Sequence, residues 1–172
     1  FDKIIPDYEE QFLQWVAPLG RDDFKGKIVM DAGCGMGRNS FWPLKYGAAK
    51  TISFDLDDRT VAAARRTLSE FPNALVEKRS IYDIGHVGEC DIAYSIGVVH
   101  HLEQPHDAIR QMTAALKPGG TLLVWVYGYE GNENVVRYVN PLRYVLCRLP
   151  LWMTTAVSYV LTTPLYVYVK LF

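Results

Sequence analysis

The sequence of 172 residues predicts an α/β protein with a doubly wound, mostly parallel sheet. Five short apolar segments alternate with segments of helical periodicity. The short segments are apolar throughout, which is typical of strands covered by helices on both faces. Hydrophobic residues make up 49% of the chain and charged residues 22%, the composition of a folded domain and not of a disordered chain or a coiled coil.

Strands are expected where short apolar runs are bounded by acidic residues, glycine or proline. In chain order they lie at 27–30, 51–54, 74–78, 91–95 and 121–127. The first run ends directly before Asp31 and the second directly before Asp55. Ligands of parallel sheets bind at the carboxyl ends of the strands, so both acids are candidate binding residues.

Helices are expected where apolar residues recur at helical spacing. In chain order they lie at 6–19, 38–46, 58–71 and 105–116. The segment Lys117–Gly120 contains proline and two glycines and is expected to stop the last of these helices.

Charge is distributed unevenly along the chain. Residues 1–133 carry a net charge of −5, whereas residues 134–172 carry +4 and no acidic residue. The basic residues before 134 are scattered among acids, so no nucleic-acid partner is expected. The three cysteines (Cys34, Cys90 and Cys147) are odd in number and widely spaced, which argues against a disulfide framework and against a metal site.

The segment 129–172 is apolar and is expected to form two or three short helices. Its uncharged stretch Leu149–Val169 is long enough to span a bilayer, but Pro150 and Pro164 interrupt it, and Pro164 is expected to start a new helix. An alternative for Leu165–Leu171 is a strand, because β-branched and aromatic residues dominate it.

Three roles for this apolar segment stay open. It is a cap over the acceptor pocket, a surface through which 135–172 makes peripheral contact with a membrane, or a subdomain packed on the core. The expected domain organisation is a core at 1–128 followed by the apolar segment at 129–172. The chain begins with Phe and ends within a pattern, so we expect a piece of a longer protein. A cytoplasmic location is expected, because the cysteine usage fits a reducing compartment.

A glycine-rich turn connects the first strand to the following helix. Gly33, Gly35 and Gly37 let the backbone approach a ligand, and the helix behind them presents N–H groups. Asp55 lies 22 residues after Gly33, where a carboxylate can accept both hydroxyls of a ribose. The alternative is a simple turn and an ordinary surface acid.

The segment Val29–Arg38 resembles motif I of class I S-adenosylmethionine-dependent methyltransferases. The resemblance continues in order through Phe54–Leu56, Ser80–Asp83, Ser95–Leu102 and Leu116–Gly120, and covers roughly residues 8–128. It implies a Rossmann-like sheet with S-adenosylmethionine as the cofactor.

The resemblance also implies a set of cofactor-binding residues: Asp31, Gly33, Cys34, Gly35, Arg38, Asp55, Leu56, Ser80, Ile81, Ser95 and Ile96. Asp31 and the backbone of the glycine turn would hold the methionine end of the cofactor. Arg38 would reach the carboxylate or brace Tyr8, and pairing with an acid of the N-terminal helix is the structural alternative.

The remaining implied contacts concern the nucleoside and the methyl group. Asp55 would bind the ribose and Leu56 would pack on the adenine. Ser80 and Ile81 stand where the family often has an acid at the adenine edge. Ser95 and Ile96 end the fourth strand and would line the methionine and methyl end.

Methyl transfer requires an acceptor held about 3–3.5 Å from the methyl carbon, and it needs neither a metal nor a covalent nucleophile. His100 and His101 follow the fourth strand, where the acceptor should enter. Adjacent helical residues do not face the same way, so at most one should point into the pocket. His100 is the candidate to orient or deprotonate the acceptor; the alternative is that both histidines pack the loop.

Together these features predict an S-adenosylmethionine-dependent methyltransferase. No Asn-Pro-Pro-Tyr-like tetrad follows the fourth strand, which by resemblance favours a small, apolar or lipid-like acceptor over a planar nitrogen. The alternatives are a dinucleotide-dependent Rossmann oxidoreductase, disfavoured by the glycine spacing and by Asp31, and a non-catalytic cofactor-binding regulatory subunit.

Overall fold

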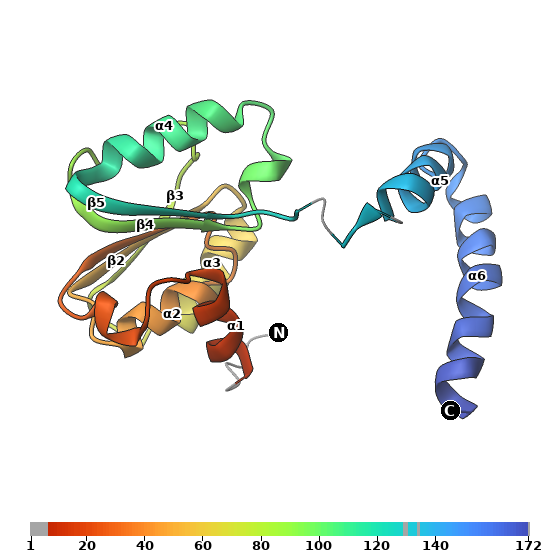
Figure 1. Cartoon of the computed structure of the whole chain (residues 1–172), viewed down its shortest axis with the longest axis horizontal. Coiled ribbons are helices and arrows are strands. Elements are labelled where there is room, and N and C mark those ends of the chain that lie inside the picture. The colour runs from red at the N-terminus through yellow and green to blue at the C-terminus, as the bar shows by residue number, and fades with distance from the viewer. Residues whose placement is uncertain (1–6, 129–130, 134, 172) are drawn as a thin grey trace. The chain divides into compact units, whose positions relative to one another are not determined.

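The structure is a computed structural model that describes residues 7–128, 131–133 and 135–171 (Figure 1). The chain divides into two compact units, residues 1–127 and residues 128–172. The two units are described separately below.

The first unit is built on a sheet of five parallel strands in the order β3-β2-β1-β4-β5. The strands are β1 Ile28–Ala32, β2 Lys50–Asp55, β3 Ala74–Lys78, β4 Cys90–Ile96 and β5 Leu116–Trp125. The chain winds outward from β1 to β3 and then returns to place β4 on the other side of β1. The predicted α/β class and parallel sheet are confirmed, and the switch point of the topology lies between β1 and β4.

Helices cover both faces of this sheet (Figure 1). Helix α4 lies on one face, and α1, α2 and α3 lie on the other. Their bounds are α1 Asp7–Trp15, α2 Arg38–Lys45, α3 Asp58–Thr67 and α4 Pro105–Ala115. Short 3₁₀ turns lie at Arg21–Phe24 and Val99–His101.

The core divides between the two faces because successive strand residues point to opposite sides. Met30 of β1 packs in the cluster that contains Met112 of α4. Its neighbour Val29 packs in a second cluster with Phe12 of α1 and Trp42 of α2. A strand buried on both faces has no polar face, which is why these strands are apolar throughout.

The predicted element boundaries differ most from the structure at three places. Helix α1 ends at Trp15 instead of residue 19, and α3 ends at Thr67 instead of residue 71; Pro6 lies outside the described residues. The segment Lys117–Gly120 belongs to β5 instead of a helix stop. Because β5 is an edge strand, Pro118 interrupts no inner ladder, and the pairing with β4 shifts register between Cys90 and Ile92.

The second unit is helical, which confirms the expected apolar helical segment after the fifth strand. It contains a short π-helix at Val135–Val139, α5 at Asn140–Leu146 and α6 at Leu151–Leu171. The expectations that Pro164 starts a helix and that Leu165–Leu171 is a strand are wrong, because Pro164 lies inside α6. The hydroxyls of Thr162 and Thr163 donate to carbonyls one turn back and support the helix beside this proline.

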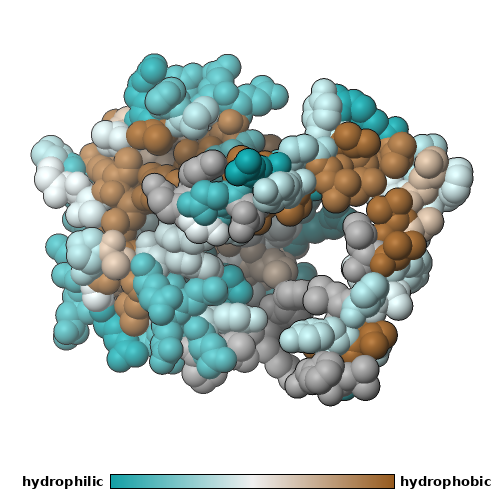
Figure 2. Space-filling model, turned by 45° about the vertical axis from the view of Figure 1, so that its right-hand side comes forward, coloured by the Kyte–Doolittle hydropathy of each residue, from teal (hydrophilic) through white to brown (hydrophobic). Residues whose placement is uncertain are grey.

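Apolar side chains form exposed patches on the helices of the second unit (Figure 2). Trp152 is 72% exposed and Val160 is 73% exposed. Within the described residues, none of the helices combines the length and the apolar character needed to cross a bilayer.

Candidate functional site

The turn between β1 and α2 has a backbone that only glycine adopts without strain. Gly33, Gly35 and Gly37 have φ values of 83°, 53° and 82°. The N–H groups of Gly33 and Cys34 both donate to the carbonyl of Phe54, at 3.0 and 2.9 Å. A Cβ atom on Gly33 would lie 2.6 Å from Cγ2 of Val98. The turn is therefore held against the ends of both β2 and β4.

Asp55 joins the turn to the end of β2. The N–H of Gly35 donates to Oδ2 of Asp55 at 2.9 Å, and the N–H of Asp57 donates to Oδ1 at 3.2 Å. No atom lies within 4 Å of the position that a Cβ on Gly35 would take. A fixed carboxylate therefore stands beside a glycine backbone that opens onto free space.

A cavity of about 130 Å³ adjoins this turn. Its lining comes from the ends of β1, β2 and β3 and from the segment after β4: Gly33, Phe54, Asp55, Leu56, Arg79, Ser80, Ile81, Tyr82, Val98 and Leu102. The lining combines apolar walls with a few polar groups, which is the composition of a small-molecule site. Leu56 is 68% exposed and is free to cover a flat ligand.

A larger hollow of about 280 Å³ lies at the opposite edge of the sheet. There, Asp91 accepts from the backbone N–H of Ile28 at 2.8 Å and pairs with Lys117 at 2.8 Å. Ligands of doubly wound sheets bind at the carboxyl ends of the strands, whereas this hollow lies at their amino ends. The smaller cavity is therefore the candidate site.

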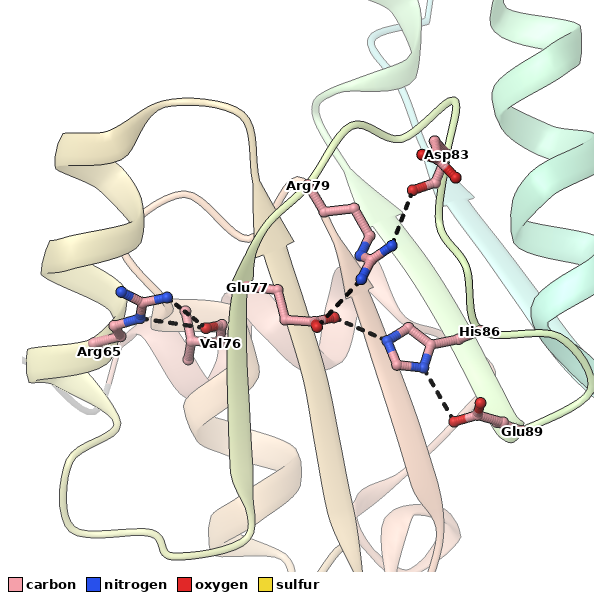
Figure 3. Close-up of polar contacts among 7 residues, drawn as sticks. All are labelled: Arg65, Val76, Glu77, Arg79, Asp83, His86 and Glu89. Atoms are coloured by element: carbon pink, nitrogen blue, oxygen red, sulfur yellow. Dashed lines mark hydrogen bonds and ion pairs between the residues drawn. The ribbon is translucent and has the colours of Figure 1, made fainter.

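A charged network holds the loop that follows β3 (Figure 3). The carboxylate of Glu77 accepts from Arg79 at 3.3 Å and pairs with Nε2 of His86 at 2.8 Å. Nδ1 of His86 lies 3.1 Å from Glu89, and Arg79 also donates to the carbonyl of Asp83. Burial raises the pKa of Glu77, but the hydrogen bonds from His86 and Arg79 outweigh it and lower the pKa below its usual value.

This network places the cavity wall that contains Ser80 and Ile81. Arg79 lines the cavity and was not identified from the sequence. A sequence signal existed, because Arg79 directly follows β3 at the same edge as Asp31 and Asp55. The structure thus brings Asp55, Leu56, Ser80 and Ile81 together, as expected for one side of a nucleoside site.

Asp31 is 1% exposed and does not face the cavity. Its Oδ2 accepts from the hydroxyl of Ser40 at 2.6 Å, and that hydroxyl accepts from Ser53 at 2.9 Å. Burial raises the pKa of Asp31 to about 7, and the charge of Asp55 adds to the shift, against the opposing hydrogen bond from Ser40. Asp31 therefore links the end of β1 to α2 through Ser40.

The structure places Ser95 and Cys34 inside the protein. Ser95 is fully buried and its hydroxyl donates to the carbonyl of Ala32 at 2.8 Å, which ties β4 to the end of β1. Ile96 packs against the core cluster of α1 and α2. Burial raises the pKa of the Cys34 thiol, so that side chain stays protonated, and the thiol donates to the carbonyl of Gly35 within the turn at 3.6 Å.

Arg38 and Tyr8 contact each other beside the glycine turn. The guanidinium of Arg38, at the start of α2, lies 4.3 Å from the ring centroid of Tyr8 in α1. Among the interpretations of Arg38, this contact supports bracing of Tyr8.

His100 and His101 lie side by side, with ring centroids 4.0 Å apart. Both are exposed and belong to the 3₁₀ turn Val99–His101. Neither ring lines the candidate cavity, and the two rings lie together because this short turn does not impose the spacing of an α-helix. Burial, together with the neighbouring His101, lowers the pKa of His100.

Comparison with known proteins identifies the same region. The model of the methyltransferase domain family matches residues 30–124. The S-adenosylmethionine-dependent methyltransferase of Mesorhizobium loti is 26% identical with a TM-score of 0.57, over 64% of this chain and 50% of that chain. A Listeria monocytogenes structure described in the same terms gives a TM-score of 0.59 at 24% identity, over 70% of this chain and 55% of that chain.

Among relatives by sequence are proteins named tRNA U34 carboxymethyltransferase. The one from Idiomarina loihiensis is 29% identical over 72% of this chain and 39% of its own length. The one from Hahella chejuensis is 32% identical over 65% of this chain and 36% of its own length. The chain therefore spans less than half the length of these relatives.

These names overturn one expectation. The sequence predicted a small-molecule acceptor, no nucleic-acid partner and an option of membrane contact through 135–172. The expectation of no nucleic-acid partner is wrong, since the relatives are named for a tRNA nucleotide. The prediction relied on the scattered basic residues of the core. The relatives are longer than this chain, and residues that bind a nucleic acid need not lie in the part that the chain matches.

Proposed function

The chain belongs to the methyltransferase domain family, whose cofactor is S-adenosylmethionine, and from this premise we propose that it methylates a nucleotide of tRNA. Binding of the cofactor is supported by one observation: the Gly35 N–H donates to the Asp55 carboxylate beside the open glycine turn. The acceptor half is supported by the names of the sequence relatives.

In this proposal each residue of the cavity binds a different part of the cofactor. Asp55 accepts hydrogen bonds from the ribose hydroxyls, and its second contact with Asp57 keeps the carboxylate in place. Leu56 and Ile81 pack on the adenine, and Ser80 lies at its edge. Asp31, which accepts from Ser40, and the backbone of the glycine turn hold the methionine end of the cofactor.

S-Adenosylmethionine supplies a methyl group that is activated by the positive charge on sulfur. The chain has to orient the acceptor atom in line with that methyl group and to exclude water. His100 stays a proposed contributor, because its lowered pKa favours the neutral imidazole, which can accept a proton from the acceptor.

The domain organisation and location belong to the same proposal. Residues 1–128 form the cofactor-binding core, and residues 129–172 form a separate apolar helical segment, inserted after the fifth strand. The cytoplasm suits the three cysteines, which are free thiols.

Binding of the cofactor is tested by calorimetric titration with S-adenosylmethionine, S-adenosylhomocysteine and NADH. We expect the first two to bind, and Asp55→Ala to raise their Kd by about tenfold or more, because hydrogen bonds to a charged group are lost. Asp58→Ala is the matched control, since Asp58 is an exposed acid that follows the same strand and does not line the cavity. Binding of NADH alone would establish an oxidoreductase instead.

The acceptor is tested separately by incubating the protein with labelled cofactor and bulk tRNA or, in parallel, a lipid extract. We expect label in tRNA, and the mass of the modified nucleoside distinguishes a methyl from a carboxymethyl group. Label in lipid alone would refute the tRNA acceptor and leave the methyltransferase assignment intact. Cofactor binding without transfer until a second protein is added would establish a regulatory subunit.

A further inference from the structure

A row of aromatic rings crosses the carboxyl edge of β4 and β5. Trp15 of α1 lies 5.2 Å from Trp125, and Trp125 lies 5.1 Å from Tyr127, measured between ring centroids. Tyr127 lies 4.9 Å from His100, whose ring contacts His101. We call these five residues the aromatic row. It joins three segments that are distant in sequence.

The outer end of the aromatic row faces solvent. Tyr127 is 67% exposed, and His100 and His101 are exposed as well. None of these three residues belongs to either core cluster of the described residues. The spacings lie within the range of interacting aromatic pairs, about 4.5–7 Å, or just below it, so the rings support one another. Core packing therefore does not account for the exposed end of the row.

The exposed end of the row lies next to the candidate cofactor cavity. Val98 and Leu102 both line that cavity, and the two histidines lie between them in the sequence. The N–H of His101 donates to the carbonyl of Val98 at 2.9 Å, and the N–H of Leu102 donates to the carbonyl of Val99 at 3.2 Å. The turn that carries the histidines is thus fixed to the cavity wall.

We propose that His100 and Tyr127 form a stacking platform for an unpaired base of RNA and present that base to the cofactor cavity. This inference rests on the proposed tRNA acceptor and names the residues that would hold it. Unpaired bases of RNA are recognised by stacking on Tyr, Trp and His rings, which tolerates any base. The base to be modified must leave its stack to be reached, and an exposed ring offers it a replacement partner.

Ring chemistry favours RNA over an apolar ligand on this platform. The imidazole nitrogens and the tyrosine hydroxyl are polar groups that an alkyl chain would desolvate without return.

The test is a titration of the 172-residue chain with an anticodon stem-loop RNA that carries U34, and with a fully paired RNA of equal length. We expect the stem-loop to bind more tightly. Tyr127→Leu should raise its Kd roughly tenfold, whereas Tyr127→Phe keeps the ring and should bind like the wild type. The salt dependence should not change in Tyr127→Leu, because no phosphate contact is lost.

Tyr159→Leu is the matched control, because Tyr159 is 68% exposed and lies in α6 of the second unit. It should bind the stem-loop like the wild type. The affinity for S-adenosylmethionine, measured in the same samples, should be unchanged in all three variants.

Each other outcome overturns the platform. Equal RNA affinity of Tyr127→Leu and the wild type would refute it and leave the tRNA acceptor standing. No binding of RNA by the wild type would refute both. Loss of cofactor affinity in Tyr127→Leu would show that Tyr127 acts through the fold. Weaker binding of Tyr127→Leu to vesicles of phosphatidylglycerol, with RNA binding unchanged, would assign the row to a lipid surface.

Discussion

The carboxyl edge of the sheet has two halves that are built by different means. At β1, β2 and β3, backbone N–H groups, left-handed glycines and a charged network determine the geometry. At β4 and β5, the exposed rings of His100 and Tyr127 form the surface, supported by the half-buried ring of Trp125 and by a 3₁₀ turn. The first half relies on a fixed backbone conformation, which suits binding of a single cofactor. The second half relies on side chains, whose identity can change to suit a different acceptor.

The comparison predicts that changes to the first half disturb the fold, while changes to the second half disturb only the acceptor. The four substitutions that follow test this difference, in order of decreasing expected effect on stability.

The largest effect is expected from pH acting on Asp31. Its pKa is about 7 in the folded protein and near 3.8 when unfolded, because burial disfavours the charged form. Between about pH 4 and pH 7 the unfolded chain releases this proton and the folded chain keeps it, so stability is full below this window and is lost as pH rises through it. The loss amounts to about 4 kcal/mol.

Asp31→Asn removes this titration. The free energy of unfolding of the variant, measured by urea denaturation, should therefore gain on the wild type between pH 4 and pH 8. If the free energies of unfolding of the variant and the wild type change in parallel with pH, burial does not raise the pKa of Asp31.

Gly33→Ala should destabilise the fold by about 3 kcal/mol, from the left-handed backbone and from the overlap with Val98. Gly88→Ala is its control, because Gly88 has a φ of 65° but no atom within 4 Å of the Cβ position. The control should lose only the backbone share, about 1 kcal/mol, in thermal denaturation. Equal losses in the two variants would mean that the turn is not pressed against β4.

Glu77→Gln should cost about 1–2 kcal/mol and weaken cofactor binding several-fold, because Arg79 and His86 lose their shared carboxylate at the cavity wall. The pKa of Glu77 is lowered, so its contribution is present above its unfolded value of 4.5 and is lost as pH falls below it.

Asp107→Asn removes an exposed ion pair with Arg110 and serves as the comparison for Glu77→Gln. It should change stability by less than about 0.5 kcal/mol and leave cofactor affinity unchanged. If calorimetry finds the two variants alike, the network does not position the loop after β3.

His100→Ala should leave the free energy of unfolding within about 0.5 kcal/mol of the wild type, because the ring is exposed. Its rate of group transfer should fall, with cofactor affinity unchanged. A large loss of stability would contradict the difference between the two halves, because the acceptor side would then also stabilise the fold.

Much of the cofactor half could be predicted from the sequence. Gly33, Gly35 and Asp55 lie at short fixed distances along the chain from strands that are apolar throughout, so one motif specifies turn and acid together. Asp31 was identified as a contact but is buried against Ser40, because the direction of a side chain at a strand end depends on the helix that covers it. The partnership of Glu77 with His86 was not predicted, since it depends on the path of the loop after β3.

The sequence by itself determined the parallel α/β core, the glycine turn with its acid and the family of the chain. These features depend on local periodicity and on backbone conformations that only certain residues adopt. Only the tertiary structure decided that α6 continues through Pro164, that His100 and His101 lie side by side, and that Trp15, Trp125 and Tyr127 join them. Those contacts depend on which segments the sheet brings to one edge, and no spacing along the chain encodes that distance.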